Sequence, residues 1–440
     1  MKKHWIKFAI TAALYALFVV WTGSYGWLLG IIVIFDIYVS KKVRWAFWKP
    51  KKTDKGAKKK TLEWVDALIF AVVAATLIRV FFVEAYTIPT SSMEKTLMVG
   101  DYLFVSKIGY GPKLPNTPLS VPLVHNTLPF TQYTPSYVEW IKRPYRRLKG
   151  FGQVQRNDIV VFNFPEGDTV VAERQNESYY ALVRQHGRDK IHQHYTILAR
   201  PVDKCENYIK RCVAIAGDTL QIIDGQRFVN GVMRDSAPNM QKNYFIKTQG
   251  TAINPRVLDK IGIPRADRMY DSQFSVYELP LTKSQVADIQ ALSNIDTMVV
   301  RNNIQLNPRA PRVFPQTASY QWTEDTYGPI WIPRKGDSIV LDSLTLPLYR
   351  RVIAQYEHNQ LEEREDGIYI NGSKASSYTF KMNYYWMMGD NRHNSLDARF
   401  WGFVPEDHIV GRASMVWMSL DPDKKFPSNI RWRRLFRVMK

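Results

Sequence analysis

Long apolar stretches fill the beginning of the chain, and short alternating runs of apolar and polar residues fill much of the remainder. The clearest apolar stretch, Val65 to Val83, approaches the ~20 residues that a helix needs to cross a bilayer. Two charged residues, Asp66 and Arg79, lie near its ends, where their side chains can reach lipid headgroups. The pattern predicts a transmembrane helix over residues 63–84, with a buried core helix of a soluble domain as the alternative.

A second apolar region, residues 5–39, is too long for one straight crossing. The turn-forming sequence TGSYG, residues 22–26, interrupts it. We therefore predict two short helices, Trp5 to Trp21 and Trp27 to Val39, that form a hairpin within residues 1–40. No small-x-small site follows the first helix cleanly, so a cleaved signal peptide is not favoured. The prediction is two or three transmembrane helices in all.

The charge distribution predicts which side of the membrane each part occupies. The chain carries a net charge of +20, and residues 41–60 hold much of the excess with a single acidic residue, Asp54. Basic loops between apolar segments are retained in the cytoplasm. We expect residues 41–62 to form a cytoplasmic loop, with the N-terminus also cytoplasmic and everything after Tyr86 outside. The loop lacks the repeated aromatic spacing of a single-strand binder, so nucleic-acid binding is not predicted.

After Tyr86 the sequence is typical of antiparallel β-structure, because short alternating runs are bounded by Gly, Asp, Asn or Pro. Asp224-Gly225 is a hairpin signal. Residues near 112–156 and 233–334 are rich in Pro, Asn and charge and are read as insertions. We predict one mainly β domain over residues 85–440. Its strand-like runs are residues 101–107, 157–165, 208–223, 227–232, 337–342, 367–373 and 412–420.

Cysteines and histidines offer little chemistry. The two cysteines, Cys205 and Cys212, would lie about 23 Å apart on one strand and could not form a disulfide. His192 and His194 could bind a metal, but no carboxylate or cysteine pattern accompanies them. We predict no metal and no cofactor.

A serine and a lysine are stronger candidates. Ser91 and Ser92 follow the predicted transmembrane helix closely, and a neutral lysine can activate a serine if burial removes its proton. Lys210 lies in a strand-like run whose alternation puts it on one face with Tyr208 and Cys212, while Arg211 points the other way. An edge lysine that extends to water is the alternative, and spacing alone favours it.

Residues 389–399 (GDNRHNSLDAR) crowd polar side chains into a predicted turn. Such a stretch is either a solvated loop or a network that orients catalytic groups. His393 lies within it, and a loop histidine is expected to be exposed rather than catalytic.

Together these motifs resemble type I signal peptidases, the Ser-Lys membrane peptidases of bacteria. The resemblance rests on four sequences in the family's order after a transmembrane helix, and these cover about a quarter of the chain. They are IPTSSMEKTLMVGDYLFVSK, RNDIVVFNFP, YIKRCVAIAGD and GDNRHNSLDARFWGFVP. The insertions and the N-terminal hairpin are not covered.

The resemblance implies a role for individual residues. The family's nucleophile is the serine directly before Met, so Ser92 rather than Ser91 is expected to be the nucleophile, with Lys210 as general base. The Ser92 backbone N–H and the Thr90 hydroxyl would form the oxyanion hole. Ser395 matches a serine that hydrogen-bonds and orients the lysine.

Four further positions correspond to supporting and substrate-binding residues. Asp397 and Arg399 match a salt bridge below the site, and Ile88 and Ile209 match residues lining shallow pockets for small side chains. Lys95 replaces the family's usual proline, and Lys95→Pro is expected to preserve activity. The departures at Asn157, where glycine is common, and Ala398, where serine is common, remove no catalytic group.

The implied function is removal of N-terminal signal peptides from secreted preproteins after a small-x-small site, at the outer face of the bacterial cytoplasmic membrane. The basic C-terminal residues 431–440 are expected to lie on anionic phospholipid, with a solvated tail as the equal alternative. The alternatives are a membrane-anchored β-domain that binds partners without cleaving them and a soluble Ser-Lys self-cleaving regulator. The sequence carries no signal for an oligomeric state.

Overall fold

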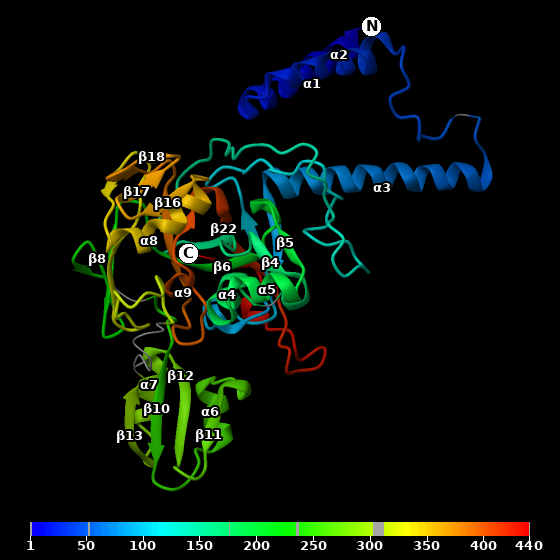
Figure 1. Ribbon diagram of the computed structural model, residues 1–440. Helices are drawn as coiled ribbons and strands as arrows, with labels where there is room; N and C mark the ends of the chain where they lie inside the picture. Colours follow the sequence, from blue (N-terminus) through cyan, green and yellow to red (C-terminus); the bar gives the residue numbers. More distant parts are fainter. Residues whose placement is uncertain (1, 52, 176, 235–236, 302–311, 440) are drawn as a thin grey trace. The chain divides into compact units, whose positions relative to one another are not determined.

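The computed structural model describes residues 2–51, 53–175, 177–234, 237–301 and 312–439. The chain divides into two compact units. The first comprises residues 1–84 and 107–152, and the second comprises residues 85–106 and 153–440. The first holds the apolar helices, and the second holds most of the β-structure (Figure 1).

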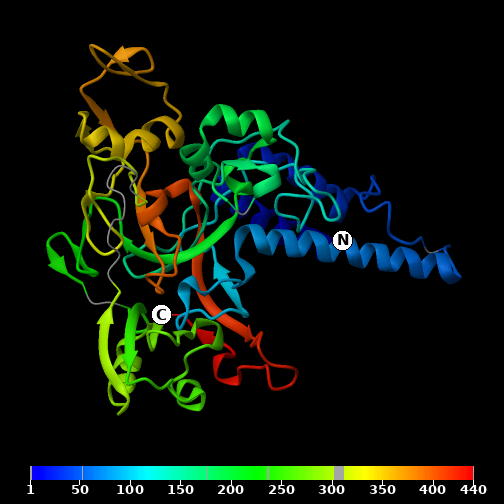
Figure 2. The same cartoon turned by 60° about the horizontal axis from the view of Figure 1, so that its bottom comes forward.

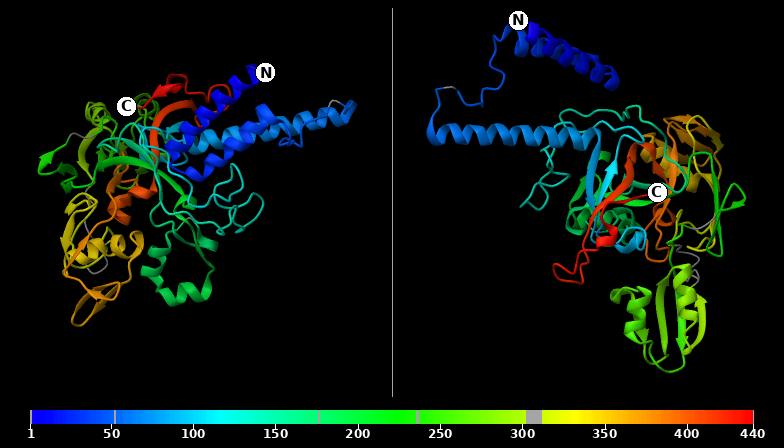
Figure 3. Two further views of the ribbon diagram at one scale, coloured as in Figure 1. Left: turned by 90° about the horizontal axis from the view of Figure 1, so that it is seen from above. Right: turned by 180° about the vertical axis from the view of Figure 1, so that it is seen from behind.

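The first unit begins with two helical arms that fold back on each other (Figure 3). The rings of Phe8 and Phe35 meet at 5.5 Å between centroids, and the Tyr15 hydroxyl donates to the Trp27 carbonyl at 2.7 Å. Such aromatic contacts hold the arms together. The elements are α1 (Lys2–Thr22), the 3-10 helix η1 (Tyr25–Leu29), α2 (Gly30–Phe35) and the π-helix η2 (Asp36–Ser40).

Helix α3 (Gly56–Phe81) begins within the basic run, so Lys58 to Lys60 lie in its first turns. Within the described part of the chain, two helices are long and apolar enough to cross a membrane, Lys3–Thr22 and Gly56–Phe81. The helical segment Tyr25–Ser40 is apolar but shorter.

Residues 107–152 of the first unit are all described and contain no helix or strand. Instead the segment folds back through isolated bridges, such as Lys113 with Arg147 and Ser120 with Tyr137. Glu84 fastens it at the end of α3, because its carboxylate lies 2.6 Å from Arg79 Nε and 2.8 Å from Lys107 Nζ. This segment corresponds to most of the first insertion.

The second unit is organised around an eight-stranded sheet in the order β1-β2-β22-β3-β6-β20-β21, with β23 also paired to β22. Each pair of neighbouring strands from β2 to β21 is antiparallel, and Figure 2 shows β22 beside β2. The mainly antiparallel β class is therefore confirmed. The strands are β1 (Val83–Thr87), β2 (Asp101–Ser106), β3 (Ile159–Asn163), β6 (Asn207–Ala214), β20 (Tyr384–Met388), β21 (Val404–Pro405), β22 (Ile409–Ser419) and β23 (Arg437–Val438).

Alternation explains which face of this sheet is buried. In β2 the side chains of Leu103 and Val105 are fully buried, while their neighbours are half-buried. They pack with Val161 of β3 and Val416 of β22 in one apolar cluster. Burial of these apolar side chains stabilises the sheet that carries the candidate site.

The predicted hairpin at Asp224-Gly225 is present. It joins β7 (Thr219–Ile223) to β8 (Gln226–Val229), with φ of 49° at Asp224 and 70° at Gly225. Two successive positive φ angles give the turn whose twist matches antiparallel strands. Strands β14 (Tyr327–Trp331) and β9 (Val232–Met233) complete this four-stranded sheet.

The second insertion contains a folded lobe, which we call the insertion domain, residues 240–301. Its sheet has the order β11-β12-β10-β13, and Figure 1 shows α6 and α7 beside these strands. Ile246, Leu279 and Ile289 are fully buried in its own apolar cluster. Its elements are β10 (Lys242–Thr248), α6 (Pro255–Ile261), the 3-10 helix η6 (Arg265–Asp267), β11 (Met269–Asp271), β12 (Val276–Leu281), α7 (Lys283–Gln290) and β13 (Ile295–Val300).

The second unit also contains shorter helices and strands. The sequence pattern did not predict these helices. The helices are α4 (Tyr179–His186), α5 (Arg188–His194), α8 (Thr345–Arg351), the π-helix η7 (Val352–Tyr356) and α9 (Ala398–Trp401). Short 3-10 helices are η3 (Ser91–Met93), η4 (Ala172–Arg174), η5 (Val202–Lys204), η8 (Glu406–His408) and η9 (Trp432–Arg434). The remaining strands are β4 (Thr169–Val171), β5 (Ile197–Ala199), β15 (Ser338–Val340), β16 (Leu361–Arg364), β17 (Gly367–Ile370), β18 (Ser373–Lys374) and β19 (Ser377–Thr379).

Candidate active site

The turn that carries Ser92 is anchored by the apolar residues after it. Met93 and Leu97 are buried in the cluster under the main sheet, and the Leu97 N–H donates to the Met93 carbonyl at 2.7 Å. Thr90 precedes the turn in extended conformation, and residues Ser91–Met93 form the 3-10 helix η3. Burial of Met93 thus determines where the preceding hydroxyl lies.

Strand β6 brings Lys210 to that hydroxyl. Lys210 Nζ lies 2.7 Å from Ser92 Oγ and also donates to the Ile209 carbonyl at 3.1 Å. The ammonium lies 5.6 Å from the centre of the Tyr208 ring, as the predicted shared face requires. Only 5% of Lys210 and 9% of Ser92 is exposed, so the edge-lysine alternative is wrong for this residue.

Because Lys210 is buried, a fraction of it is neutral near physiological pH. Desolvation lowers its pKa from 10.5 to about 8, although the carboxylates of Asp397 and Asp390 favour the charged form. A lysine of this kind can accept a serine proton, which an ordinary surface lysine cannot do at that pH.

The two adjacent serines have different surroundings. Ser91 Oγ accepts from Asn394 Nδ2 at 3.0 Å, and the Ser91 carbonyl accepts from Asn391 Nδ2 at 3.3 Å. The Ser92 carbonyl accepts from the Asn391 N–H at 3.1 Å, whereas its hydroxyl faces Lys210. The loop 389–399 therefore holds the turn from one side while Lys210 approaches from the other.

Asp390 connects this loop to the strand of Lys210, and sequence reasoning missed this contact. Its carboxylate receives Arg211 Nε at 2.8 Å, Arg211 Nη2 at 2.6 Å and Thr96 Oγ1 at 2.6 Å. Burial alone would raise the pKa of Asp390, but the Arg211 hydrogen bonds and charge bring it below its ordinary value. The alternation that put Arg211 opposite Lys210 was the available signal.

Asp397 and Arg399 form a buried ion pair. Arg399 Nε and Nη2 each lie 2.9 Å from an Asp397 oxygen, and the Gly389 N–H donates to the same carboxylate at 3.1 Å. Burial would raise the pKa of Asp397, but the Arg399 charge outweighs that and lowers it. Arg399 also donates to the Arg392 carbonyl at 2.5 Å, which braces the loop.

The expected hydrogen bond from Ser395 to Lys210 is absent. Ser395 is buried, and its hydroxyl has no hydrogen-bond partner within the part of the chain that the structure describes. It packs on Gly389, where an added Cβ would lie 2.2 Å from Ser395 Oγ and 2.6 Å from the Ser92 carbonyl oxygen. Lys210 Nζ is instead occupied by Ser92 and the Ile209 carbonyl.

The remaining predicted residues flank the turn. Thr90 is exposed, and its side chain makes no capping hydrogen bond to η3. Ile88 is buried beside Met93, and Ile209 is half-buried against the same apolar cluster.

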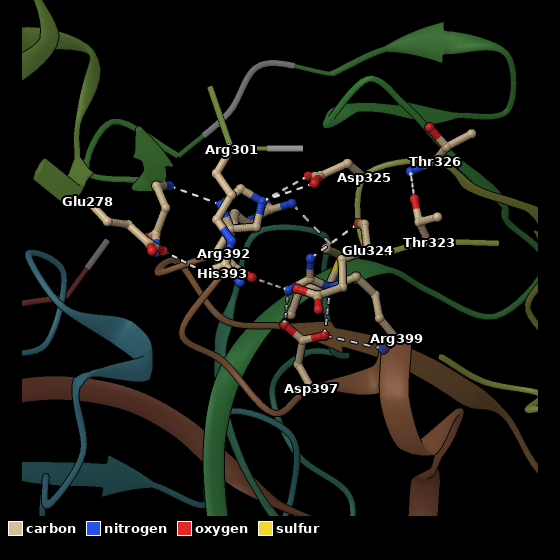
Figure 4. Close-up of polar contacts among 12 residues, drawn as sticks. Glu278, Arg301, Thr323, Glu324, Asp325, Thr326, Arg392, His393, Asp397 and Arg399 are labelled. Carbon is tan, nitrogen blue, oxygen red and sulfur yellow. Dashed lines mark hydrogen bonds and ion pairs between the residues drawn. The ribbon is translucent and has the colours of Figure 1, made fainter. Parts of the chain in front are cut away.

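His393 is not the exposed loop residue that we expected. None of its side chain is accessible, and its Nε2 lies 3.0 Å from Asp325 Oδ1 (Figure 4). Its Nδ1 accepts the Asn243 N–H at 2.9 Å. The ring is buried because the insertion domain covers this part of the loop, which a local sequence pattern does not reveal. The Nε2 of His192 lies 2.9 Å from the Tyr179 hydroxyl.

The backbone at Lys95 differs from the one that the family's usual proline requires. Lys95 has φ of 68°, whereas the proline ring holds φ near −65°. Proline would therefore require a different turn directly after the nucleophile candidate.

The sequence matches the family described as signal peptidase, peptidase S26, over residues 61–282 and 312–418. The chain belongs to this family. It is similar to the signal peptidase I of Haemophilus influenzae, with 25% identity over 382 residues, 86% of this chain and 76% of the relative. It shares 23% identity with the signal peptidase I of Buchnera aphidicola subsp. Schizaphis graminum, over 82% of this chain and 76% of the relative. It shares 21% identity with the signal peptidase I of Aquifex aeolicus, over 80% of this chain and 82% of the relative.

The S26 match spans Ser92, Lys210 and the loop 389–399. Family membership makes the chain a serine endopeptidase that removes signal peptides. The family is membrane-anchored, and the two long apolar helices near the N-terminus are compatible with such an anchor.

Proposed function

We propose that Ser92 and Lys210 are the nucleophile and general base of this signal peptidase. The observation that carries the proposal is the 2.7 Å contact between Lys210 Nζ and Ser92 Oγ inside a buried site. Neutral Lys210 takes the hydroxyl proton as Ser92 attacks the scissile carbonyl carbon. The protonated lysine then gives this proton to the leaving amine. A water molecule, deprotonated by Lys210, then attacks the acyl carbon. The bond from that carbon to Ser92 Oγ breaks as Lys210 returns the proton to Oγ, which frees the carboxyl product.

The oxyanion of each tetrahedral intermediate would be stabilised by the Ser92 N–H and the Thr90 hydroxyl. Thr90 is free to turn its hydroxyl toward the substrate, because that side chain is exposed and is not used as a helix cap. The substrate is a preprotein bound in extended form. Its small residues, at the last and third-last positions of the signal peptide, would lie against Ile88 and Ile209.

The experiment is cleavage of a purified preprotein in detergent by the wild type, Ser92→Ala and Ser91→Ala. We expect only Ser92→Ala to be inactive, with the product cut after a small-x-small site. Equal cleavage by all three would refute Ser92 as the nucleophile. A folded wild type that binds the preprotein without cutting it would instead support the binding-domain alternative.

The proposed topology puts the helical hairpin and α3 across the cytoplasmic membrane, with the basic loop inside and the second unit outside. The support is the position of Lys41 to Lys60 between apolar segments. A cysteine introduced at Lys3 should be protected from an impermeant thiol reagent in intact cells. Labelling of that cysteine in intact cells would place the N-terminus outside and exclude the three-crossing arrangement.

The C-terminal segment is proposed to contact anionic lipid. Trp432 and Phe436 are each 68% exposed, and the exposed Arg433 and Arg437 lie beside them. In reconstituted vesicles, cleavage should be faster with anionic than with zwitterionic lipid, and replacing both arginines by serine should remove that difference. Equal wild-type rates in the two vesicle types would contradict the proposal.

A further inference from the structure

Lys95 lies three residues after Ser92 in a backbone conformation that side chains rarely adopt. Its φ of 68° is in the left-handed region, where a Cβ crowds the following carbonyl. Such conformations persist only when the surrounding structure holds them in place, and they are frequent at functional sites. The contacts of Lys95 therefore show what determines the shape of the nucleophile turn.

The ammonium of Lys95 binds the insertion domain. Its Nζ donates to the carbonyl of Gly262, the residue directly after helix α6. The last carbonyls of a helix attract cations because they carry the negative end of its dipole. Burial lowers the pKa of Lys95, and the carboxylates of Glu94 and Asp267 counter that effect. The Lys95 ammonium, from the turn that carries Ser92, thus contacts the C-terminal end of a helix in the insertion domain.

The insertion domain makes a second contact with the site through the loop 389–399. The Gln241 N–H donates to the Asp390 carbonyl at 2.8 Å, and the Arg392 N–H donates to the Gln241 carbonyl at 3.0 Å. The Asn243 N–H donates to His393 Nδ1 at 2.9 Å, and His393 Nε2 faces Asp325 (Figure 4).

Both contacts involve segments that adjoin Ser92. The loop at 390–393 reaches the Ser92 carbonyl through the Asn391 N–H, and Lys95 follows Ser92 on the same turn. The insertion domain has its own apolar cluster, so it is a body against which both segments can be held at a constant separation.

We propose that Lys95 is a positioning residue that fastens the nucleophile turn to the insertion domain, so that this domain sets the approach of Ser92 to Lys210. The proposal rests on the proposed roles of Ser92 and Lys210. Precise placement of reacting groups affects the rate of the bound complex more than substrate binding. Loss of the Lys95 contact should therefore lower kcat and leave KM nearly unchanged.

The test measures kcat, KM and the pH dependence of preprotein cleavage by full-length protein in detergent. The variants are Lys95→Met, which keeps the crowded backbone without the contact, Lys95→Gly, which removes the crowding as well, and Lys95→Arg, which keeps a donor. Lys247→Met is the control, because Lys247 is an exposed lysine of the insertion domain. We expect kcat to fall roughly tenfold for Met and Gly, with KM within about twofold. Arg should retain most of the activity, and the pH midpoint should not move.

Several outcomes would overturn the proposal. A wild-type kcat in Lys95→Gly would mean that the contact between Lys95 and Gly262 only compensates for the crowded backbone and does not position Ser92. Loss in Lys95→Met of the rise in kcat/KM between pH 6 and pH 8 would make Lys95 a proton-transfer group instead. An equal fall in Lys247→Met would show that the effect is not specific. Ser92→Ala is measured in the same series, because activity in that variant would refute the proposed function independently of any result at Lys95. If Lys95→Met does not fold, the Gly and Arg variants still decide.

Discussion

The protonation of Lys210 should govern the pH dependence of the reaction. A group that must accept a proton works only in its neutral form, and burial lowers the pKa of Lys210 from 10.5 to about 8. At pH 7 about a tenth of the molecules would hold a neutral lysine, compared with roughly 0.03% for an unshifted one. Burial therefore increases the reactive fraction by roughly 300-fold at that pH.

The assay is the initial rate of preprotein cleavage at low substrate concentration, where kcat/KM reports on groups of the free enzyme. From pH 6 to pH 8 the reactive fraction rises from about 1% to about half, so kcat/KM should rise roughly 50-fold and then level off. A flat profile from pH 6 to pH 10 would refute a lysine base. A midpoint near 10.5 would refute the argument from burial while leaving the dyad intact.

The same shift predicts an effect on stability. Because the folded-state pKa lies below the unfolded value, the unfolded chain binds more protons between pH 8 and 10.5, and the free energy of unfolding rises with pH in that window. Below pH 8 the buried charge destabilises the fold by about 3 kcal/mol. Lys210→Met removes this charge with similar side-chain volume. Its Tm should exceed that of the wild type at pH 7, and the difference should shrink by pH 10.5; a difference independent of pH would contradict the reasoning.

Three substitutions probe the supports of the site. Gly389→Ala should lower kcat more than tenfold, because its Cβ would lie 2.6 Å from the Ser92 carbonyl oxygen; wild-type kcat would show that the loop can move aside. Asp390→Asn leaves the Arg211 guanidinium without its charged partner and should cost about 3–5 kcal/mol of stability, measured as a fall in Tm. Thr90→Ala should cost roughly 2–4 kcal/mol in kcat/KM, while Thr90→Ser is tolerated; unchanged turnover in Thr90→Ala would remove it from the oxyanion hole.

In the candidate site, local sequence pattern predicted side-chain orientation but not contact partners. Strand alternation put Lys210 on one face of β6 and Arg211 on the other, and the structure has both orientations. The same alternation could not name their partners, because Ser92 and Asp390 are 118 and 179 residues away from them. Partners at such separations are chosen by strand order, which depends on how the whole sheet packs.

The features that the sequence did not reveal have the same origin. His393 was expected to be exposed because its neighbours are polar, yet the start of β10 and Asp325 enclose it. The expectation for Lys95→Pro was made without the φ angle of Lys95, which sequence does not report, and that angle coexists with a contact beside α6 more than a hundred residues away. In both cases the insertion domain supplies the deciding contact.

The sequence by itself determined the elements whose cause is local: the apolar helices, the alternating strands, the Asp224-Gly225 turn and the residue types able to perform Ser-Lys chemistry. These follow from side-chain period and backbone preference over a few residues. Only the tertiary structure decided the burial of Lys210, its 2.7 Å contact with Ser92 and the fastening of the nucleophile turn to the insertion domain. Burial and long-range contact depend on the packing of segments that are remote in sequence, and that packing is what shifts a lysine pKa and holds two reacting groups together.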